Sequence, residues 1–581
     1  MSTRIAAFSG EIPRVIPRLL DNNFAQVAQN TKLEDGSLLP IRRARYVHRM
    51  PINCKTIYKN GEEWLGWDRI VRVVPAPVAE NRLYVTGDGK PKVIANGVTY
   101  DLAVPRPANK LTISLVSGTP DPKLSSTILY TYTWVTELDE ESEPAPLSNE
   151  LLWSPGLDVK LSGFSAPPAG RGINRMRIYR SQTSESGITN LYFIHERAVS
   201  AADFVDVVAD NPINEVLPSS DYNAPPDDLQ GLTSLPNGMM AAFVGKKLYF
   251  SEPYRPHAWP EKYILTCDYE IVGLGVFGTS VAIMTNGCPY VAQGTAPENM
   301  TMDRLRVNLP CLSANSIVDL GYSVAYASTQ GLVTISQSGA IVASEGMMTR
   351  DQWRQMQPES FIAGQFSGRY MASYAYLDAD NIERRGIIIF DLTGAQSFLV
   401  RASDNADAMF FEIGTGVLYI LRNGRDVFEW DAISQPYGEM YWRSKRFVSP
   451  TLYNWGAVLI EGEDATSDEQ IKERLAKNAA ARARNRARMN ADNSDGALGD
   501  AALGVVTFAG SLLEPVEEED PTFSCTIYGD GKPLATIYRL NQIERLPAKR
   551  LYTTMEIEIR GNQRVTGISV GSTPEELAGG G

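Results

Sequence analysis

The feature that most constrains this chain is a series of short β-hairpins at near-regular spacing. Each is an apolar strand that runs into a polar turn and is followed by another strand, as in Leu83–Gly89 and Leu418–Gly424. Asp-Gly and Asn-Gly supply the positive φ that a tight hairpin needs. The turns are centred on Gly89, Gly245, Gly287, Gly331, Asp380 and Gly424.

The spacing of these turns indicates a repeat. Gly245 and Gly287 are 42 residues apart, and Gly287 and Gly331 are 44 apart. Gly331 and Gly424 are 93 residues apart, with the Asp380 turn between them. A hairpin every ~40–50 residues is typical of β-propeller blades. The sequence therefore predicts a mainly β protein built on a β-propeller of about six blades.

One interval is too long for a blade. Gly89 and Gly245 are 156 residues apart, which leaves roughly 110 residues beyond one blade, enough for a domain of common size. Pro-rich stretches at 105–107 and 225–228 bound this piece. We therefore expect a first blade at 51–110, an inserted domain at 111–229 and the remaining blades at 230–435.

The inserted piece has the alternation of a β-sandwich. Leu129–Thr136 alternates over eight residues, and Met176–Arg180 is a further strand. The string Tyr130–Ser148 resembles a fibronectin type III-like module. The resemblance implies a sandwich inserted between the first and second blades.

The N-terminal residues 1–50 are unlike a blade. Pro13 and Pro17 keep Glu11–Leu20 out of a helix, which predicts an extended arm. Asp21–Leu33 is expected to form one or two helical turns. Arg42, Arg43 and Arg45 form a local basic cluster. Such an arm either lies on a neighbouring subunit or straps over the chain's own body.

A C-terminal β-domain is expected at 436–463 and 505–577, interrupted by a projecting basic helix and a flexible return at 464–504. Ser467–Gln470 has the pattern of a capping box, and the Ala-, Arg- and Lys-rich sequence that follows predicts a helix over 467–489. Its apolar stripe is short, so its own domain cannot bury it. It is expected to be a solvated arm or to dock on another protein subunit or on nucleic acid.

The candidate residues for docking between subunits or on a partner are basic residues of the arm and of this helix. They are Arg14, Arg18, Lys472, Arg474, Lys477, Arg482, Arg484, Arg486 and Arg488.

Composition narrows the class of protein. Apolar residues make up 43% of the chain, which is ample for packed cores, and no apolar run approaches a membrane span. The N-terminus has no apolar leader. The net charge of −13 argues against a general nucleic-acid binder. Five cysteines without CxxC spacing indicate buried free thiols.

Two motif matches are better explained by strands. Gly273–Gly278 fits GxGxxG, but a strand and a hairpin follow it, where a dinucleotide site needs a helix. Gly567–Gly571 fits GxSxG, but no histidine follows it and the string alternates like a strand. The three histidines, His48, His195 and His257, lack metal-ligand spacing. The sequence predicts no enzyme, no cofactor and no metal site.

Four strings resemble virion proteins of tailed phages. They are Ile16–Asn30, Leu38–Pro40, Trp442–Lys445 and Thr573–Leu577. The family they resemble most is the tail nozzle or tail hub (tail tubular protein B) of short-tailed bacteriophages. The resemblance is one of pattern across most of the chain and contains no catalytic motif. The basic helix at 467–489 has no counterpart that we can assign.

The resemblance implies a structural virion protein made in the host cytoplasm and carried in the phage tail. It implies a homo-oligomer, a sixfold ring below the portal and head-to-tail adaptor. Such a ring would carry tail fibres or spikes and surround the channel through which genomic DNA passes. The alternative hypothesis is a β-propeller protein that binds or degrades host-surface glycan. A further alternative is a receptor-binding module that uses the insert as its adhesin.

Overall fold

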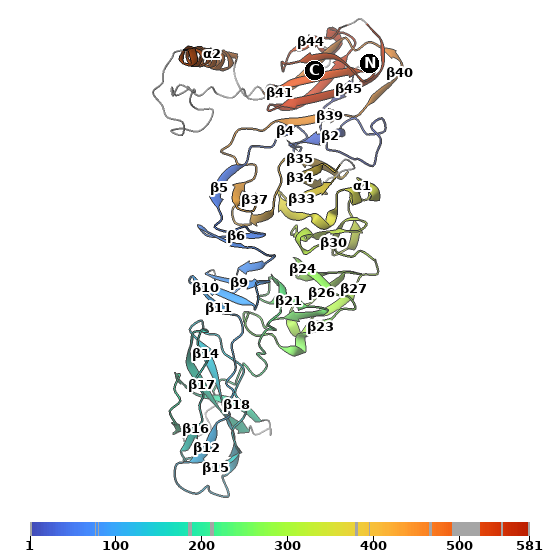
Figure 1. Cartoon of the computed structure of the whole chain (residues 1–581). Helices are drawn as coiled ribbons and strands as arrows, with labels where there is room; N and C mark the ends of the chain where they lie inside the picture. The colour runs from blue at the N-terminus through green and yellow to red at the C-terminus, as the bar shows by residue number, and fades with distance from the viewer. Residues whose placement is uncertain are drawn as a thin grey trace.

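The computed structural model describes residues 3–75, 77–79, 81–183, 189–208, 214–377, 381–393, 396–463, 468–490, 523–547 and 550–578. The protein is mainly β, as predicted, and is divided into many small sheets. Figure 1 shows an elongated molecule with both chain ends in the C-terminal β-domain at one end. Small sheets fill the middle, and the sheets of residues 112–206 form the other end.

Four of the small sheets are four-stranded, antiparallel and built from strands consecutive in the sequence. They comprise β8 Arg72–Pro75, β9 Arg82–Thr86, β10 Lys92–Ala95 and β11 Val98–Asp101; β20 Gln230–Ser234, β21 Met240–Val244, β22 Lys247–Phe250 and β23 Leu265–Thr266; β24 Ile271–Phe277, β25 Ser280–Thr285, β26 Tyr290–Gln293 and β27 Thr301–Arg304; and β28 Val318–Asp319, β29 Val324–Ser328, β30 Gly331–Ser336 and β31 Gly339–Val342.

Two further groups draw strands from elsewhere in the chain. β32 Ile362–Phe366, β33 Arg369–Leu377, β34 Glu383–Asp391 and β35 Phe398–Ala402 continue into the C-terminal sheet. β36 Ala408–Glu412, β37 Val417–Arg422 and β38 Asp426–Glu429 take their fourth strand from β5, Arg45–Arg49. None of the described sheets closes on itself.

The predicted hairpins are present. Each of the six turns lies between two paired antiparallel strands, for example β25 and β26 around Gly287 and β37 and β38 around Gly424. Asn423 and Gly424 both have positive φ, 53° and 68°, as a tight hairpin turn with this twist requires. Residues 378–380 of the Asp380 turn lie outside the described residues.

The small sheets pack face to face in sequence order. In β25, Val281 and Ile283 lie in a core shared with β22, whereas Ala282 and Met284 lie in a core shared with β29. Alternate side chains of a strand point to opposite faces of its sheet. The strand is therefore buried on both faces, which is why it is a continuous apolar run in the sequence.

The residues between β11 and β20 form three small sheets around a core of their own. The strands are β12 Thr112–Leu115, β13 Ser126–Ile128, β14 Tyr130–Thr136, β15 Leu151–Trp153, β16 Val159–Ser162, β17 Ile173–Thr183, β18 Thr189–Ala198 and β19 Phe204–Asp206. The sheet β12-β16-β19 and the sheet β14-β17-β18 share a core that includes Tyr132, Leu161 and Ile178. We call these residues the insert.

The N-terminal segment does not project as an arm. It contributes the strands β1 Thr3–Ile5, β2 Ala25–Gln29, β3 Thr31–Lys32, β4 Leu39–Pro40 and β5. β1 pairs with β46 (Arg564–Gly571), β2 pairs with both β39 (Met440–Ser444) and β35, and β5 pairs with β38. The segment is therefore a strap on the chain's own body. The helical turns expected at Asp21–Leu33 are wrong, because Ala25–Gln29 is a strand paired with β39 and Thr31–Lys32 is a strand paired with β4.

The region expected as the first blade, 51–110, holds two sheets. β6 Thr56–Asn60 and β7 Glu63–Trp67 form a two-stranded sheet, and β8–β11 form a separate one. The β6–β7 hairpin packs against the sheet of β36. There the rings of Trp64 and Tyr419 make an edge-to-face contact with their centroids 5.0 Å apart.

The C-terminal β-domain is built from strands on both sides of the basic helix. They are β39 Met440–Ser444, β40 Phe447–Tyr453, β41 Ala457–Glu463, β42 Ser524–Gly529, β43 Lys532–Ile537, β44 Ile543–Arg545, β45 Tyr552–Gly561 and β46 Arg564–Gly571. The predicted helix is present as α2, Asp468–Asn490. Ser467, which begins the expected capping box, and residues 491–522 lie outside the described residues.

The remaining helices are short. They are α1 Arg350–Gln355, α3 Pro574–Ala578, η1 Glu261–Tyr263, η2 Pro297–Asn299, η3 Ala314–Ser316 and η4 Pro358–Ser360. The GxGxxG match lies in the β24–β25 hairpin and the GxSxG match lies in β46, so both are strands as predicted. All five cysteines are buried and free, also as predicted.

Candidate functional site

A dense polar network lies where the insert meets the small sheets, around the turn that follows β14. Arg82 of β9 donates to the carbonyl of Leu138 at 3.2 Å. The hydroxyl of Tyr100, in β11, donates to Glu137. Arg171 reaches back to the carbonyl of Ala103 at 3.2 Å. The turn is therefore tied to the sheet β8–β11 by side chains from both sides. We call this region the insert junction.

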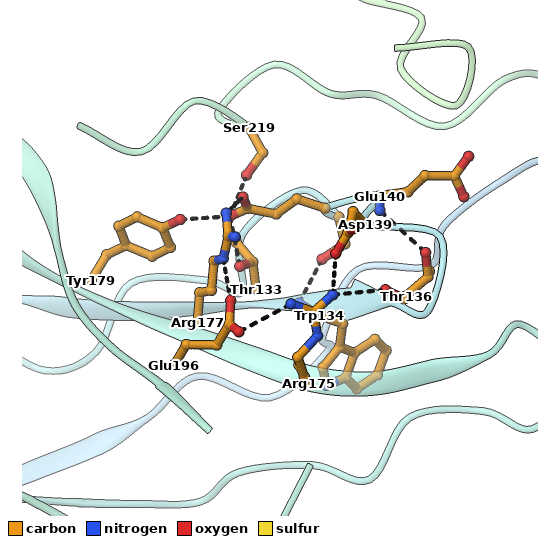
Figure 2. Close-up of polar contacts among 12 residues, drawn as sticks. Thr133, Trp134, Thr136, Asp139, Glu140, Arg175, Arg177, Tyr179, Glu196 and Ser219 are labelled. Atoms are coloured by element: carbon orange, nitrogen blue, oxygen red, sulfur yellow. Dashed lines mark hydrogen bonds and ion pairs between the residues drawn. The ribbon is translucent and has the colours of Figure 1, made fainter. Parts of the chain in front are cut away.

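Glu141 is the centre of the insert junction. Its side chain is buried, at 6% exposed, and its Oε1 accepts from Thr133 Oγ1 and Tyr179 Oη, each at 2.8 Å. Ser219, from the segment that leaves the insert, donates to the same oxygen at 3.3 Å, and Arg177 Nη1 lies 3.0 Å from Oε2 (Figure 2). Because four side chains donate to this carboxylate, its role is to stabilise the fold.

An arginine ladder on β17 supports Glu141. Arg175 and Arg177 are two residues apart, so they lie on the same face of the strand. Both donate to Glu196 of the neighbouring β18, at 3.0 Å and 2.7 Å, and Arg175 also pairs with Asp139 (Figure 2). The hydrogen bond from Arg177 lowers the pKa of Glu196. Burial and the Glu141 charge raise the pKa of Tyr179.

A second buried group joins the insert to the segment before η1. Glu140 pairs with Arg171, and both side chains are at most 5% exposed. His257 Nε2 lies 3.1 Å from the carbonyl oxygen of Glu141, and its Nδ1 lies 3.9 Å from Glu140 Oε1. Burial lowers the pKa of His257 to about 4. The histidine is therefore neutral at pH 7 and holds the insert without a charge of its own.

A cavity of about 710 Å³ opens among the small sheets, near the starts of β6, β28, β32 and β36. Its polar lining includes Asn53, Lys55, Asp68, Asn315, Glu359 and Asp407. Two of the carboxylates already have partners: Asp407 accepts from the Gly424 amide at 2.7 Å, and Asp68 pairs with Arg69 at 2.8 Å. No group of three or more histidine, cysteine, aspartate or glutamate side chains among the described residues is placed to hold a metal ion.

Of the predicted docking residues, the two on the N-terminal segment lie on the surface of the chain's own body. Arg14 is exposed, its guanidinium donates to the carbonyl of Glu345, and its amide donates to the carbonyl of Met347 at 2.9 Å. Arg18 is exposed close to Pro17, whose carbonyl accepts from the Arg446 amide at 3.1 Å.

The other predicted docking residues are on α2, which lies beside the C-terminal β-domain (Figure 1). Lys477, Arg482, Arg484 and Arg486 are exposed. The side chains of Lys472, Arg474 and Arg488 lie outside the described residues. Arg18 therefore lies at the C-terminal β-domain, beside which α2 also lies, whereas Arg14 lies near Met347. The role of these residues in docking stays a prediction.

Sequence reasoning missed the insert junction. The signals were present: Glu140 and Glu141 form an acidic pair directly after a strand, and Arg175 and Arg177 alternate along another strand. Strand periodicity places the arginines on one face, but only the pairing of β14 with β17 sets that face beside the acidic turn.

Comparisons with known proteins give no assignment. No family model matches the chain, and no curated protein matches it. Among solved structures, a match is PorZ, an essential surface component of the type-IX secretion system of Porphyromonas gingivalis. It has a TM-score of 0.21 and 11% identity, and the match covers 70% of this chain and 45% of PorZ. The chain thus spans less than half of PorZ, and a likeness this weak transfers neither fold nor function. No described helix is long and apolar enough to cross a membrane.

Proposed function

We propose that this chain is a structural subunit of a bacteriophage tail that forms a nozzle or hub ring below the portal and adaptor. The observation that carries the proposal is the elongated, serial arrangement of the small sheets and the insert. The insert lies at the opposite end from the two termini (Figure 1). Hydrogen bonds from Arg82, Tyr100 and His257 join it to the small sheets. A long subunit with fixed joints suits a wall that must keep its shape around a channel.

The proposal includes a β-propeller of about six blades. Its support is the order of contacts between first strands: β20 contacts β8 and β24, β24 contacts β28, β28 contacts β32, and β32 contacts β36. The last sheet takes its fourth strand from the N-terminal segment, since β5 pairs with β38. Joining an early and a late strand of the proposed propeller in one sheet is a means of closing a ring of blades.

In this role the protein acts mechanically and electrostatically. The net charge of −13 means that a wall made of such subunits would repel phosphates, and genomic DNA would pass without adhering. The partners would be further copies of the chain in a closed, sixfold ring, the portal and adaptor, and tail fibres or spikes. The basic residues of the N-terminal segment and of α2 are the proposed contacts.

The mass of the assembled protein tests this proposal. Native mass spectrometry and light scattering over a concentration series are expected to give a single closed oligomer, and cryo-electron microscopy is expected to show a ring around a channel. A chain that stays monomeric at all concentrations and within purified virions would contradict the proposal.

The alternative function is binding or degradation of host-surface glycan. The observation that favours it is the cavity among the small sheets, because its carboxylates and amides are groups that can bind sugar hydroxyls. Incubation with capsule and lipopolysaccharide, with release of reducing ends as the readout, tests it. Activity lost in Glu359→Gln and kept in Glu62→Gln, an exposed residue of the β6–β7 turn, would favour the glycan hypothesis.

A further inference from the structure

A cleft of about 790 Å³ lies between the sheet that contains β5 and the C-terminal sheet. The N-terminal strap crosses it between β4 and β5, and β37, β39 and β45 supply other parts of the wall. Its charged lining is Arg42, Arg43, Arg422, Arg560, Asp404 and Glu439. We call it the arginine cleft. It is distant from the insert junction, since these elements lie toward the end with the two termini (Figure 1).

Two of the four arginines are already paired with carboxylates. Arg422 lies 2.5 Å from Asp404, and Arg560 lies 2.9 Å from Glu558. Even so, Arg422 keeps a buried Nε without an acceptor among the described residues. The wall therefore has an unused donor beside an existing ion pair.

The guanidinium groups of the other two arginines have no carboxylate partner among the described residues, although the backbone amide of Arg42 donates to Asp431 at 2.7 Å. Arg42 donates to the carbonyl of Gln435 at 3.1 Å and to the hydroxyl of Tyr437 at 3.0 Å, and its guanidinium stacks on the Tyr437 ring at 4.2 Å. These neutral partners orient the guanidinium without cancelling its charge. Arg43 is exposed, and its side chain has no hydrogen-bond or ion-pair partner in the described chain. The cleft lining thus carries four arginines against two carboxylates, Asp404 and Glu439, in a protein whose net charge is −13.

The rest of the lining is not that of a phosphate groove. Ile41 and Trp430 are apolar, and Tyr441 lies under the Arg560 guanidinium at 4.5 Å. A nucleic-acid surface needs a basic stripe along several phosphates, and the charge here is confined to one compact cleft. A guanidinium group can bind a carboxylate through two parallel hydrogen bonds, and the apolar and aromatic residues beside it can contact the rest of a peptide. The cleft therefore suits the carboxylates of a peptide.

We propose that the arginine cleft binds an acidic segment of a protein chain, with its carboxylates on Arg42 and Arg43. The inference is independent of the phage-tail proposal, because the cleft would have the same preference in any assembly. It assigns a role to Arg42 and Arg43, which stand out in the sequence only as a local basic cluster.

A binding assay on the full chain tests the proposal. The probe is a fluorescein-labelled ten-residue peptide of alternating Glu and Ala, followed by anisotropy at low and high salt. We expect saturable binding that weakens with salt. A peptide with Gln in place of Glu is expected to bind at least tenfold more weakly. Arg42→Gln/Arg43→Gln is expected to cost at least tenfold in affinity for the Glu peptide.

Two controls keep the test decisive. Arg43→Gln alone retains the contacts of Arg42 with Gln435 and Tyr437, so it separates binding from folding and is expected to lose part of the affinity. Arg106→Gln/Lys110→Gln removes the same charge from an exposed segment and is expected to bind like the parent. Equal binding by parent and cleft variants would overturn the proposal. Tighter, cleft-dependent binding of a ten-nucleotide single strand would also overturn it, in favour of a nucleic-acid site.

Discussion

The insert junction and the arginine cleft use the same two kinds of side chain with opposite results. In the junction, Glu141 is buried and surrounded by donors, and Arg175 and Arg177 both have carboxylate partners. In the cleft, the Arg42 guanidinium has neutral partners and the Arg43 side chain has none among the described residues. The Glu141 side chain is thus fully paired within the chain, whereas Glu140 Oε1, Arg171 Nη1 and His257 Nδ1 beside it have no hydrogen-bond partner among the described residues. The cleft differs in that two of its guanidinium groups have no carboxylate partner among the described residues. Burial and ion pairing, more than residue type, decide whether a cluster of charged side chains stabilises the fold or can bind a partner.

The largest expected effect comes from breaking the junction at Glu141. Glu141→Ala leaves the buried hydroxyls of Thr133 and Tyr179 without their acceptor, which costs about 1–3 kcal/mol for each, while Arg177 keeps its ion pair with Glu196. Urea unfolding followed by circular dichroism and by proteolysis of the insert measures the loss. Asp139→Ala is the matched control in the same network. Its side chain is 79% exposed, so we expect less than about 1 kcal/mol. Equal losses would show that the buried centre is not what holds the joint.

Acid is expected to weaken the junction through His257. The unfolded chain protonates this histidine near pH 6.5, whereas burial lowers its folded pKa to about 4. The stabilisation is complete above pH 6.5 and is lost as the pH falls toward 4, by up to about 3 kcal/mol. Thermal unfolding at a series of pH values checks this expectation. His257→Gln can still contact the Glu141 carbonyl but does not titrate, so its stability should fall less steeply. If stability falls equally steeply with pH in the parent and in His257→Gln, protonation of His257 is not the cause of the loss.

A smaller effect is expected from changing the charge balance of the cleft. Asp404→Asn removes the carboxylate that offsets Arg422, so the affinity of the Glu/Ala peptide should rise about threefold at low salt. The anisotropy assay measures it, and Asp139→Asn in the insert should leave the affinity unchanged. A fall in affinity would mean that Asp404 positions Arg422 for the ligand.

The smallest effect is expected at an exposed ion pair between β5 and β38. Arg45 lies 2.6 Å from Glu429, but its side chain is 51% exposed, so Arg45→Gln should cost less than about 1 kcal/mol. Urea unfolding measures the change. A loss of stability as large as that of Glu141→Ala would show that this exposed pair stabilises the last small sheet as strongly as the buried Glu141 contacts stabilise the junction. That result would contradict the view that burial decides the strength of an ion pair.

The hairpins, the helix at α2 and the buried thiols were predictable from the sequence. Each rests on a local pattern: Asn423 and Gly424 require a turn, and Val281–Met284 is apolar at every position because both faces are covered. The segment 1–50 was predicted less well. Strand β2 has too little local signal, and its extended form depends on pairing with β39, more than four hundred residues away.

The candidate sites show the same limit. The basic cluster at Arg42 and Arg43 was visible, but Arg422 and Arg560 come from distant strands, so their convergence could not be predicted. Likewise, Glu141 and Arg177 are each unremarkable in sequence, and only the pairing of β14 with β17 brings them to 3.0 Å.

The sequence by itself determined where this chain turns, which strands are apolar on both faces and where its long helix lies. These features depend on backbone conformation and on the polarity of neighbouring residues. The tertiary structure alone decided that the N-terminal segment completes the last small sheet, and which charges are neutralised. Both depend on contacts between residues hundreds of positions apart, and a carboxylate or a guanidinium acquires its role only from the partners and the burial that those contacts create.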